Sequence, residues 1–196
     1  NNTVFADNKG NIAYWHGNFV PKRNKKYNWS NPVDGTIVAT EWNGLHTLEE
    51  IVHVYNPASG WIQNCNSTPF TMSGSSSPKK EHYPIYMAPD GENFRGINAV
   101  RVLSKENAFT IDKMIDAGYN RYLSAFEILI PALVNSFEKN VSVNDSLYLQ
   151  LNGVIRVLKE WDYYSSETSI ATTIAIEWAE KLSSTLRRIY IDEGWD

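Results

Sequence analysis

The sequence predicts an α+β fold, with β-hairpins in residues 1–93 and a helical subdomain in residues 94–196. Two observations carry this prediction. Short apolar runs separated by Asn, Gly and Pro fill the first part, and this pattern is typical of strands joined by tight turns. From Phe94 onward, apolar residues recur every three or four positions, which is the period of an amphipathic helix.

A β-hairpin is predicted at residues 3–16, where the strand-like runs TVFA and IAYW flank the segment DNKGN. Asn and Gly accept the positive φ that a tight hairpin turn requires. Further strands are predicted at residues 35–40, 51–55 and 61–64. The small and polar segment MSGSSSPKK, at residues 72–80, is predicted to be a mobile loop.

Capping residues and apolar stripes define the predicted helices. Asn107 or Thr110 is suited to cap a short helix, and Asn144 or Asp145 a later one. Pro131 lies inside a helical stripe, and we expect it to kink or divide that helix because proline cannot donate the helical hydrogen bond. The three stripes are Leu123, Phe126, Ile130, Leu133, Val134 and Phe137; Leu147, Leu151, Val154, Ile155, Leu158 and Trp161; and Ile170, Ile174, Trp178, Leu182, Leu186 and Tyr190.

Composition excludes several classes of protein. Lys and Arg number 18 against 22 Asp and Glu, so the net charge of −4 gives no field for binding a polyanion. No apolar run approaches the roughly 20 residues that span a bilayer, and the single Cys65 cannot close an intramolecular disulfide. The chain shows neither a signal-peptide pattern nor an initiator Met, so Asn1 is expected to be an internal cut or a processed end. The basic cluster at residues 22–26 is interpreted as a solvated loop.

Common catalytic and metal-binding motifs do not occur in the sequence. The four histidines, at positions 16, 46, 53 and 82, lack the spacing of a helical metal pair. There is no glycine-rich phosphate loop and no Gly-x-Ser-x-Gly elbow. Cys65 with His53 is a conceivable nucleophile and base, but a structural cysteine is the favoured interpretation.

Two stretches nevertheless form a specific pattern. The first is NTVFADNKGNIAYWH at residues 2–16, followed by VPKR at 20–23, and the second is NPASGWIQNCNSTP at 56–69. Their order and spacing resemble the β-chain of the penicillin acylase family. The resemblance is strong over residues 2–69 and looser to about residue 162. Its matched Gly, Asn and Pro residues have specific backbone demands, which makes coincidence an unsatisfactory explanation.

This resemblance implies an N-terminal-nucleophile amidohydrolase, in which a terminal Ser attacks the amide and its own α-amino group serves as base. It also implies that Asn2 donates a hydrogen bond in the oxyanion hole and that Arg23 supports the active site. Chemically, an amide NH₂ is a neutral donor suited to a developing negative charge, and Arg remains charged at any working pH. Without the resemblance, Asn2 would be interpreted as a strand-end residue and Arg23 as a surface cation.

The other matched residues are interpreted as architecture. Asp7 and Gly10 suit the hairpin turn, and residues 56–60 suit consecutive turns. Asn64 and Asn66 are expected to satisfy loop backbone, and His16 is regarded as structural. A core role is favoured for the tryptophans at 15, 42 and 61, with an acyl pocket as the alternative.

The family nucleophile is absent from the chain, because it is expected a few hundred residues upstream of Asn2. The chain is therefore predicted to be an internal portion of the β-chain and inactive when isolated. The family fold implied is an αββα sandwich completed by the rest of the precursor, the predicted partner. Nucleic acid and membrane are not predicted as partners, and the exposed strand edges are expected to invite dimerisation.

The predicted substrate is a small N-acyl amide, such as a β-lactam side chain or an acyl-homoserine lactone. Neither the acyl group nor the amine is specified by the sequence. No cofactor is predicted; a family calcium site is implied, but its ligands cannot be assigned here. The resemblance implies a periplasmic or secreted location. An aromatic-rich binding module, for example for glycans on the seven Trp, is the alternative function.

Overall fold

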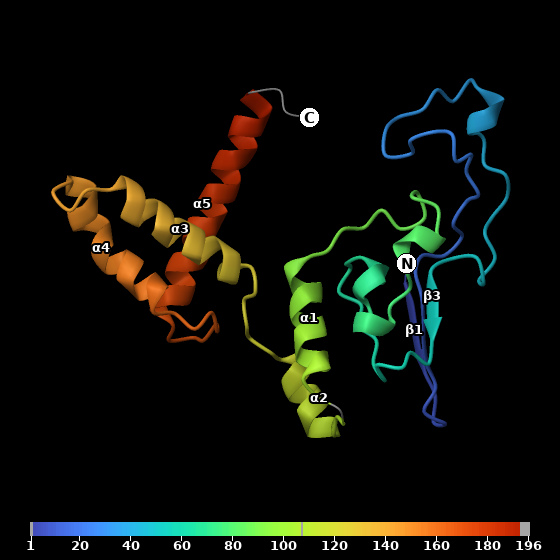
Figure 1. Cartoon of the computed structure of the whole chain (residues 1–196), viewed down its shortest axis with the longest axis horizontal. Coiled ribbons are helices and arrows are strands. Elements are labelled where there is room, and N and C mark those ends of the chain that lie inside the picture. The colour runs from blue at the N-terminus through green and yellow to red at the C-terminus, as the bar shows by residue number, and fades with distance from the viewer. Residues whose placement is uncertain (1, 107, 193–196) are drawn as a thin grey trace. The chain divides into compact units, whose positions relative to one another are not determined.

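The first part of the chain contains a small β-sheet and the second part is helical, so the fold is a mixture of strands and helices (Figure 1). The computed structural model describes residues 2–106 and 108–192. The strands are β1 (Thr3–Ala6), β2 (Ile12–Trp15) and β3 (His53–Tyr55), and the α-helices are α1 (Phe94–Ser104), α2 (Ile111–Gly118), α3 (Phe126–Asn140), α4 (Ser146–Lys159) and α5 (Ile170–Asp192). None of the helices in the described residues is both long and apolar enough to cross a bilayer.

The predicted hairpin is confirmed. β1 pairs antiparallel with β2, with Thr3 opposite Trp15, and β2 pairs antiparallel with β3. The turn is built by local chemistry, because Asp7 Oδ1 accepts the backbone N–H groups of Lys9 and Asn11 at 2.9 Å each. Gly10, with φ of +86°, takes the left-handed conformation that the turn requires.

Two predicted strands do not form. Residues 35–40 contain a 3-10 helix at Val38–Thr40 instead, because Asp34 Oδ1 accepts from both the backbone N–H and the hydroxyl of Thr36 and so starts a turn. Residues 61–64 also contain no strand. The third predicted strand, at 51–55, is confirmed for its last three residues, as β3.

The segment at 72–80 is a packed element rather than the loop that its composition predicted. A 3-10 helix spans Gly74–Ser76, and the flanking Met72, Ser73 and Ser77 are buried. Ser77 Oγ accepts the Ser73 N–H at 2.9 Å, so small polar side chains satisfy buried backbone here. Met72 itself joins the core formed by Tyr14, Ile51, Val52, Met72, Met87 and Ala88.

The chain divides into two compact units, Asn1–Ala117 and Gly118–Asp196. Secondary structure changes at residue 94, where α1 begins, but α1 is fastened to the first unit. Asn93 caps α1 by accepting the Gly96 N–H at 2.9 Å, and its Nδ2 donates to the carbonyl groups of Cys65 and Asn66 at 3.1 Å each. Packing therefore places the boundary between units later than the change from strand to helix.

The second unit consists of α3, α4 and α5 around an apolar core. The buried residues are Phe126, Ile130, Val134, Phe137, Ile155, Leu158, Trp161, Ala171 and Ala175, most of them from the predicted stripes. Pro131 lies within the continuous α3 and does not divide it. Asp145 rather than Asn144 caps α4. Thr110 Oγ1 accepts the Lys113 N–H at the start of α2, and Asn107 lies outside the described residues.

Gly96 provides a test of how α1 packs. A Cβ at this position would lie 2.5 Å from Ser67 Oγ and 2.9 Å from Ser67 Cβ. We expect Gly96→Ala to lower the free energy of unfolding by about 1–3 kcal/mol through overpacking, measured by urea unfolding. The matched control is Gly153→Ala in α4, where a Cβ meets nothing within 4 Å, and where we expect a gain of up to about 1 kcal/mol from helix propensity. Equal effects at both glycines would contradict this packing.

Candidate functional site

A polar pocket of about 540 Å³ lies beside the start of β1. The strand register builds it: Thr3 stands opposite Trp15, so the residue before β1 meets the residues that follow β2. The loop that carries Asn64 closes it from another part of the chain. The lining residues are Asn2, His16, Gly17, Asn64, Asn66, Ser67 and Asp90.

The Asn2 carboxamide has a defined orientation in this pocket. Its Oδ1 accepts the Gly17 N–H at 3.0 Å, and its Nδ2 donates to Asn64 Oδ1 at 3.2 Å. An amide NH₂ carries two hydrogens, and among the described residues no second acceptor takes the other one. Asn64, which was expected to satisfy loop backbone, does so through the Asn66 N–H and also orients Asn2. The arrangement leaves one neutral N–H donor available at the pocket.

A Tyr–His–carboxylate chain, buried except at its carboxylate, borders the same pocket. Tyr14 Oη lies 2.9 Å from His16 Nδ1, and His16 Nε2 lies 2.9 Å from Asp90 Oδ2. Tyr14 and His16 are buried, whereas the Asp90 side chain is 48% exposed. Burial, followed by the negative charge of Asp90, raises the pKa of Tyr14 above its usual range. Tyr14 therefore keeps its phenolic hydrogen.

Arg23 lies in a different hollow, a groove of about 1120 Å³ lined by basic and aromatic side chains of residues 23–30 and 81–89. Its guanidinium carbon is 5.0 Å from the Trp29 ring centroid, a cation–π arrangement. The basic cluster at 22–26, expected to be a solvated loop, thus contributes Arg23, Lys25 and Lys26 to the groove. The structure does not bring Arg23 into the pocket of Asn2.

A second Tyr–His–carboxylate chain holds the backbone at Arg23. The Arg23 N–H donates to Tyr86 Oη at 3.2 Å, and Tyr86 Oη lies 3.0 Å from His46 Nε2. His46 Nδ1 in turn lies 3.2 Å from Glu50 Oε2. Glu50 also accepts from the Thr47 N–H and the Lys22 ammonium at about 3 Å. The Thr47 N–H, followed by the Lys22 ammonium, lowers the pKa of Glu50 to about 2.

The alternative nucleophile and base share no hydrogen bond among the described residues. His53 Nδ1 lies 2.8 Å from the Ile51 carbonyl, just before β3, while Cys65 is half-buried. Within the part of the chain that the structure describes, no three His, Cys, Asp or Glu side chains gather closely enough to hold a metal ion. No metal ligands are therefore assigned.

The predicted core role holds for only some of the tryptophans. Trp15 packs against the core of the first unit. Trp61 is half-buried, close to the position that a Cβ on Gly74 would take. Trp42 is 66% exposed, so the prediction of a core role is wrong for this residue.

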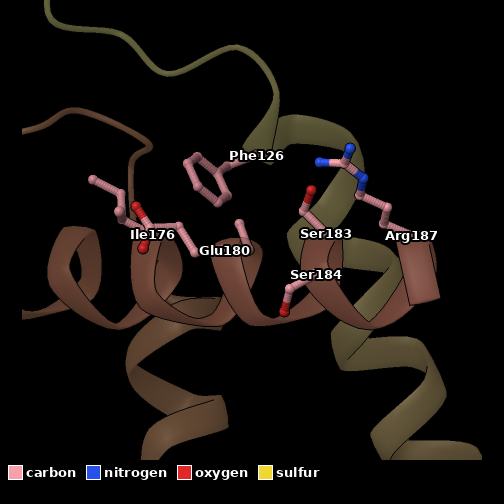
Figure 2. A pocket seen from close by; sticks show the side chains of 7 residues that line it. Phe126, Ile176, Glu180, Ser183, Ser184 and Arg187 are labelled. Atoms are coloured by element: carbon pink, nitrogen blue, oxygen red, sulfur yellow. The ribbon is translucent and has the colours of Figure 1, made fainter.

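The helical unit has a hollow of its own, between α3 and α5. Figure 2 shows Phe126 facing a row of α5 side chains that includes Ile176, Glu180 and Ser183. The neighbouring Ser184 hydroxyl donates to the Lys181 carbonyl of its own helix at 2.8 Å. Among the described residues, no base is hydrogen-bonded to these hydroxyl groups, so this hollow offers no activated nucleophile.

Sequence analysis missed the roles of Tyr14 and Asp90. The contact between Tyr14 and His16 could have been expected from the sequence. Tyr14 lies in a predicted strand and His16 follows two positions later, and residues two apart along a strand point to the same face of the sheet. The contact with Asp90 had no such signal, because Asp90 lies 74 residues from His16 and only the fold brings it to the pocket.

Comparisons with known proteins agree with one another. A family model described as penicillin amidase matches residues 1–192. Penicillin G acylase from Escherichia coli is 41% identical over 68 residues, which are 35% of this chain and 8% of that protein. A solved structure of a thermostable penicillin G acylase from Alcaligenes faecalis has a TM-score of 0.58 at 20% identity, covering 85% of this chain and 28% of that one. The chain spans less than a third of the length of these relatives. The likeness to the Alcaligenes faecalis structure, at 20% identity, shows the fold alone.

The low pKa of Glu50 makes the segment around Arg23 sensitive to acid. The folded value of about 2 lies below the ordinary 4.5, so the unfolded chain takes up the proton first. The stabilisation is complete above about pH 4.5 and is lost as the pH falls toward 2. We expect Glu50→Gln to lower the urea midpoint at about pH 6 and to change it little at about pH 2. An equal difference at both pH values would contradict this assignment.

Proposed function

This chain belongs to the penicillin amidase family, and we propose that it forms part of an amide hydrolase whose oxyanion hole includes Asn2. The observation that carries the proposal is the orientation of the Asn2 carboxamide, with Oδ1 on the Gly17 N–H and Nδ2 at the pocket. Attack on an amide carbonyl creates a tetrahedral oxyanion, and one preorganised donor stabilises the transition state by roughly 3–4 kcal/mol. A neutral N–H serves without losing a proton.

The attacking group is proposed to be a Ser at the start of a longer β-chain, outside these 196 residues, with its own α-amino group as base. The chemistry of the pocket supports this. Ser67 is the one hydroxyl side chain among the described lining residues, and its Oγ accepts from Gln63 Nε2 at 3.5 Å. His16 has both ring nitrogens bonded to Tyr14 and Asp90. No base is hydrogen-bonded to Ser67 among the described residues, which favours a nucleophile from elsewhere.

Arg23 is proposed to support the active-site network from its groove. Its backbone is held by Tyr86, and its guanidinium, stacked near Trp29, remains charged and able to hold two acceptors. No step in the proposed mechanism is assigned to a metal ion. In this proposal, Asn2 donates a hydrogen bond to the oxyanion, and Arg23 holds neighbouring groups in place.

The rest of the precursor is the proposed partner. All four residues of β1 are exposed, including Val4 at 57% and Phe5 at 44%. Because neighbouring residues of a strand point to opposite faces, β1 is uncovered on both faces, as expected of a strand that belongs to a larger αββα sandwich. The proposed substrates are N-acyl amides such as β-lactam side chains or acyl-homoserine lactones. A periplasmic or secreted location is proposed on family resemblance, and family membership favours hydrolysis over the alternative of a glycan-binding module.

Replacement of Asn2 tests the proposed oxyanion role. In the enzyme processed from the full-length precursor, we expect Asn2→Ala to lower kcat/KM for an N-acyl chromogenic amide by about 10²–10³-fold, without loss of thermal stability. The matched control is Asn8→Ala, an exposed position in the turn of the same hairpin, which should leave the rate unchanged. An Asn2→Ala rate within threefold of wild type would falsify the oxyanion role.

The 196 residues alone are expected to hydrolyse no amide, because the proposed nucleophile is not among them. The measurement is release of the chromophore by the purified chain over hours. Turnover that disappears on Asn2→Ala would overturn the proposal that the nucleophile lies outside these residues, since it would show that an attacking group exists within them.

A further inference from the structure

We propose that Tyr14, His16 and Asp90 are positioning residues that keep the Asn2 carboxamide turned with its N–H toward the pocket. This inference rests on the proposed function, since it assigns the residues that prepare the proposed oxyanion donor. The three residues act through one backbone group, the Gly17 N–H, which directly follows His16 and binds Asn2 Oδ1 at 3.0 Å.

The first step is the immobilisation of the His16 ring. Asp90, as a carboxylate, only accepts hydrogen bonds, so His16 Nε2 carries the hydrogen of that 2.9 Å contact. Tyr14 then supplies its O–H to Nδ1 at 2.9 Å. With both nitrogens bonded and the residue 7% exposed, rotation of the imidazole would break the buried hydrogen bond to Tyr14 and the part-buried one to Asp90. Such bonds are costly to leave unmade.

The second step is the transfer of this constraint to the backbone. The His16 N–H donates to the Val52 carbonyl at 2.8 Å, so ring and backbone of His16 are both fixed. Gly17 then takes φ of +74°, and a Cβ there would lie 3.2 Å from Val20 Cγ2. The chain turns at Gly17, and its N–H stays on Asn2 Oδ1 as long as the preceding His16 backbone is held.

The third step concerns the amide itself. A carboxamide that rotates by half a turn exchanges its oxygen and nitrogen. In the flipped state, Oδ1 would face the pocket and repel a developing oxyanion, while Nδ2 would face the Gly17 N–H, donor against donor. The Gly17 N–H selects the productive orientation only while it stays in place. Tyr14, His16 and Asp90 keep it there by holding the backbone that leads into Gly17.

Hydrogen exchange tests the structural part of this inference without any activity. In the full-length processed enzyme, exchange is measured by mass spectrometry with fragmentation to single residues. We expect Tyr14→Phe to accelerate exchange of the Gly17 amide by about tenfold, close to the effect of Asn2→Ala. The Asn56 amide, bonded to the Ile12 carbonyl at 2.8 Å elsewhere in the sheet, should not change. Equal acceleration at Gly17 and Asn56 would show a merely structural role and overturn the proposal.

A double-mutant cycle tests whether the residues act through Asn2. We expect Tyr14→Phe to lower kcat about tenfold with KM unchanged, as for loss of a bond made in the transition state. In the Asn2→Ala background, the same change should have no further effect. Asp90→Ala, at a half-exposed site, provides a second variant with the same expected pattern. The matched control is Tyr55→Phe, on an exposed face of β3, which should alter neither background.

The outcomes separate this inference from the proposed function. Equal losses in both backgrounds would overturn the positioning role and leave the hydrolase intact. If the wild-type enzyme turns over no N-acyl amide, the proposed function fails. The exchange rate of the Gly17 amide then still decides whether Tyr14 and His16 hold the Asn2 carboxamide in place.

Discussion

The antiparallel register of β1 and β2 is the constraint on which the candidate site depends. With Thr3 opposite Trp15, Asn2 meets the Gly17 N–H that follows β2. A slip of one residue would invert every side chain of one strand relative to the sheet and would remove Asn2 from this donor. The turn that fixes the register is itself made by Asp7 and Gly10. A few local hydrogen bonds in the hairpin thus determine where the proposed oxyanion donor, Asn2, lies.

The first unit uses one arrangement twice. Tyr14, His16 and Asp90 border the pocket of Asn2, while Tyr86, His46 and Glu50 hold the backbone at Arg23. In each case the imidazole is buried or half-buried, and one of its nitrogens is hydrogen-bonded to a phenol and the other to a carboxylate. A histidine bonded at both nitrogens is an orienting group rather than a free base. This bonding agrees with the proposal that the nucleophile and its base lie outside these residues.

Packing governs the fold where composition alone is misleading. The segment MSGSSSPKK has the composition of a loop, yet Met72 and Ser73 are almost fully buried because neighbouring hydroxyl groups satisfy the backbone. α1 begins where the sequence changes character, yet Asn93 ties it to the loop at Cys65 and Asn66. β1 differs from these segments. Its sequence is typical of a strand and it forms one, but both its faces remain uncovered in this chain.

The sequence by itself determined the features that depend on neighbours in the chain. These are the hairpin at 3–16, the helical second half, a helix cap at 144–145 and, through Asn, Gly and Pro at demanding backbone positions, the family. The predicted strand at 35–40 failed because the side-chain hydrogen bonds of Asp34 compete locally with strand pairing, and residues 61–64 form no strand either. Only the tertiary structure decided the surroundings of Asn2 and Arg23. Asp90 reaches His16 across 74 residues and Tyr86 reaches Arg23 across 63, and contacts between residues so distant in sequence are fixed by the packing of the core, which no local pattern encodes.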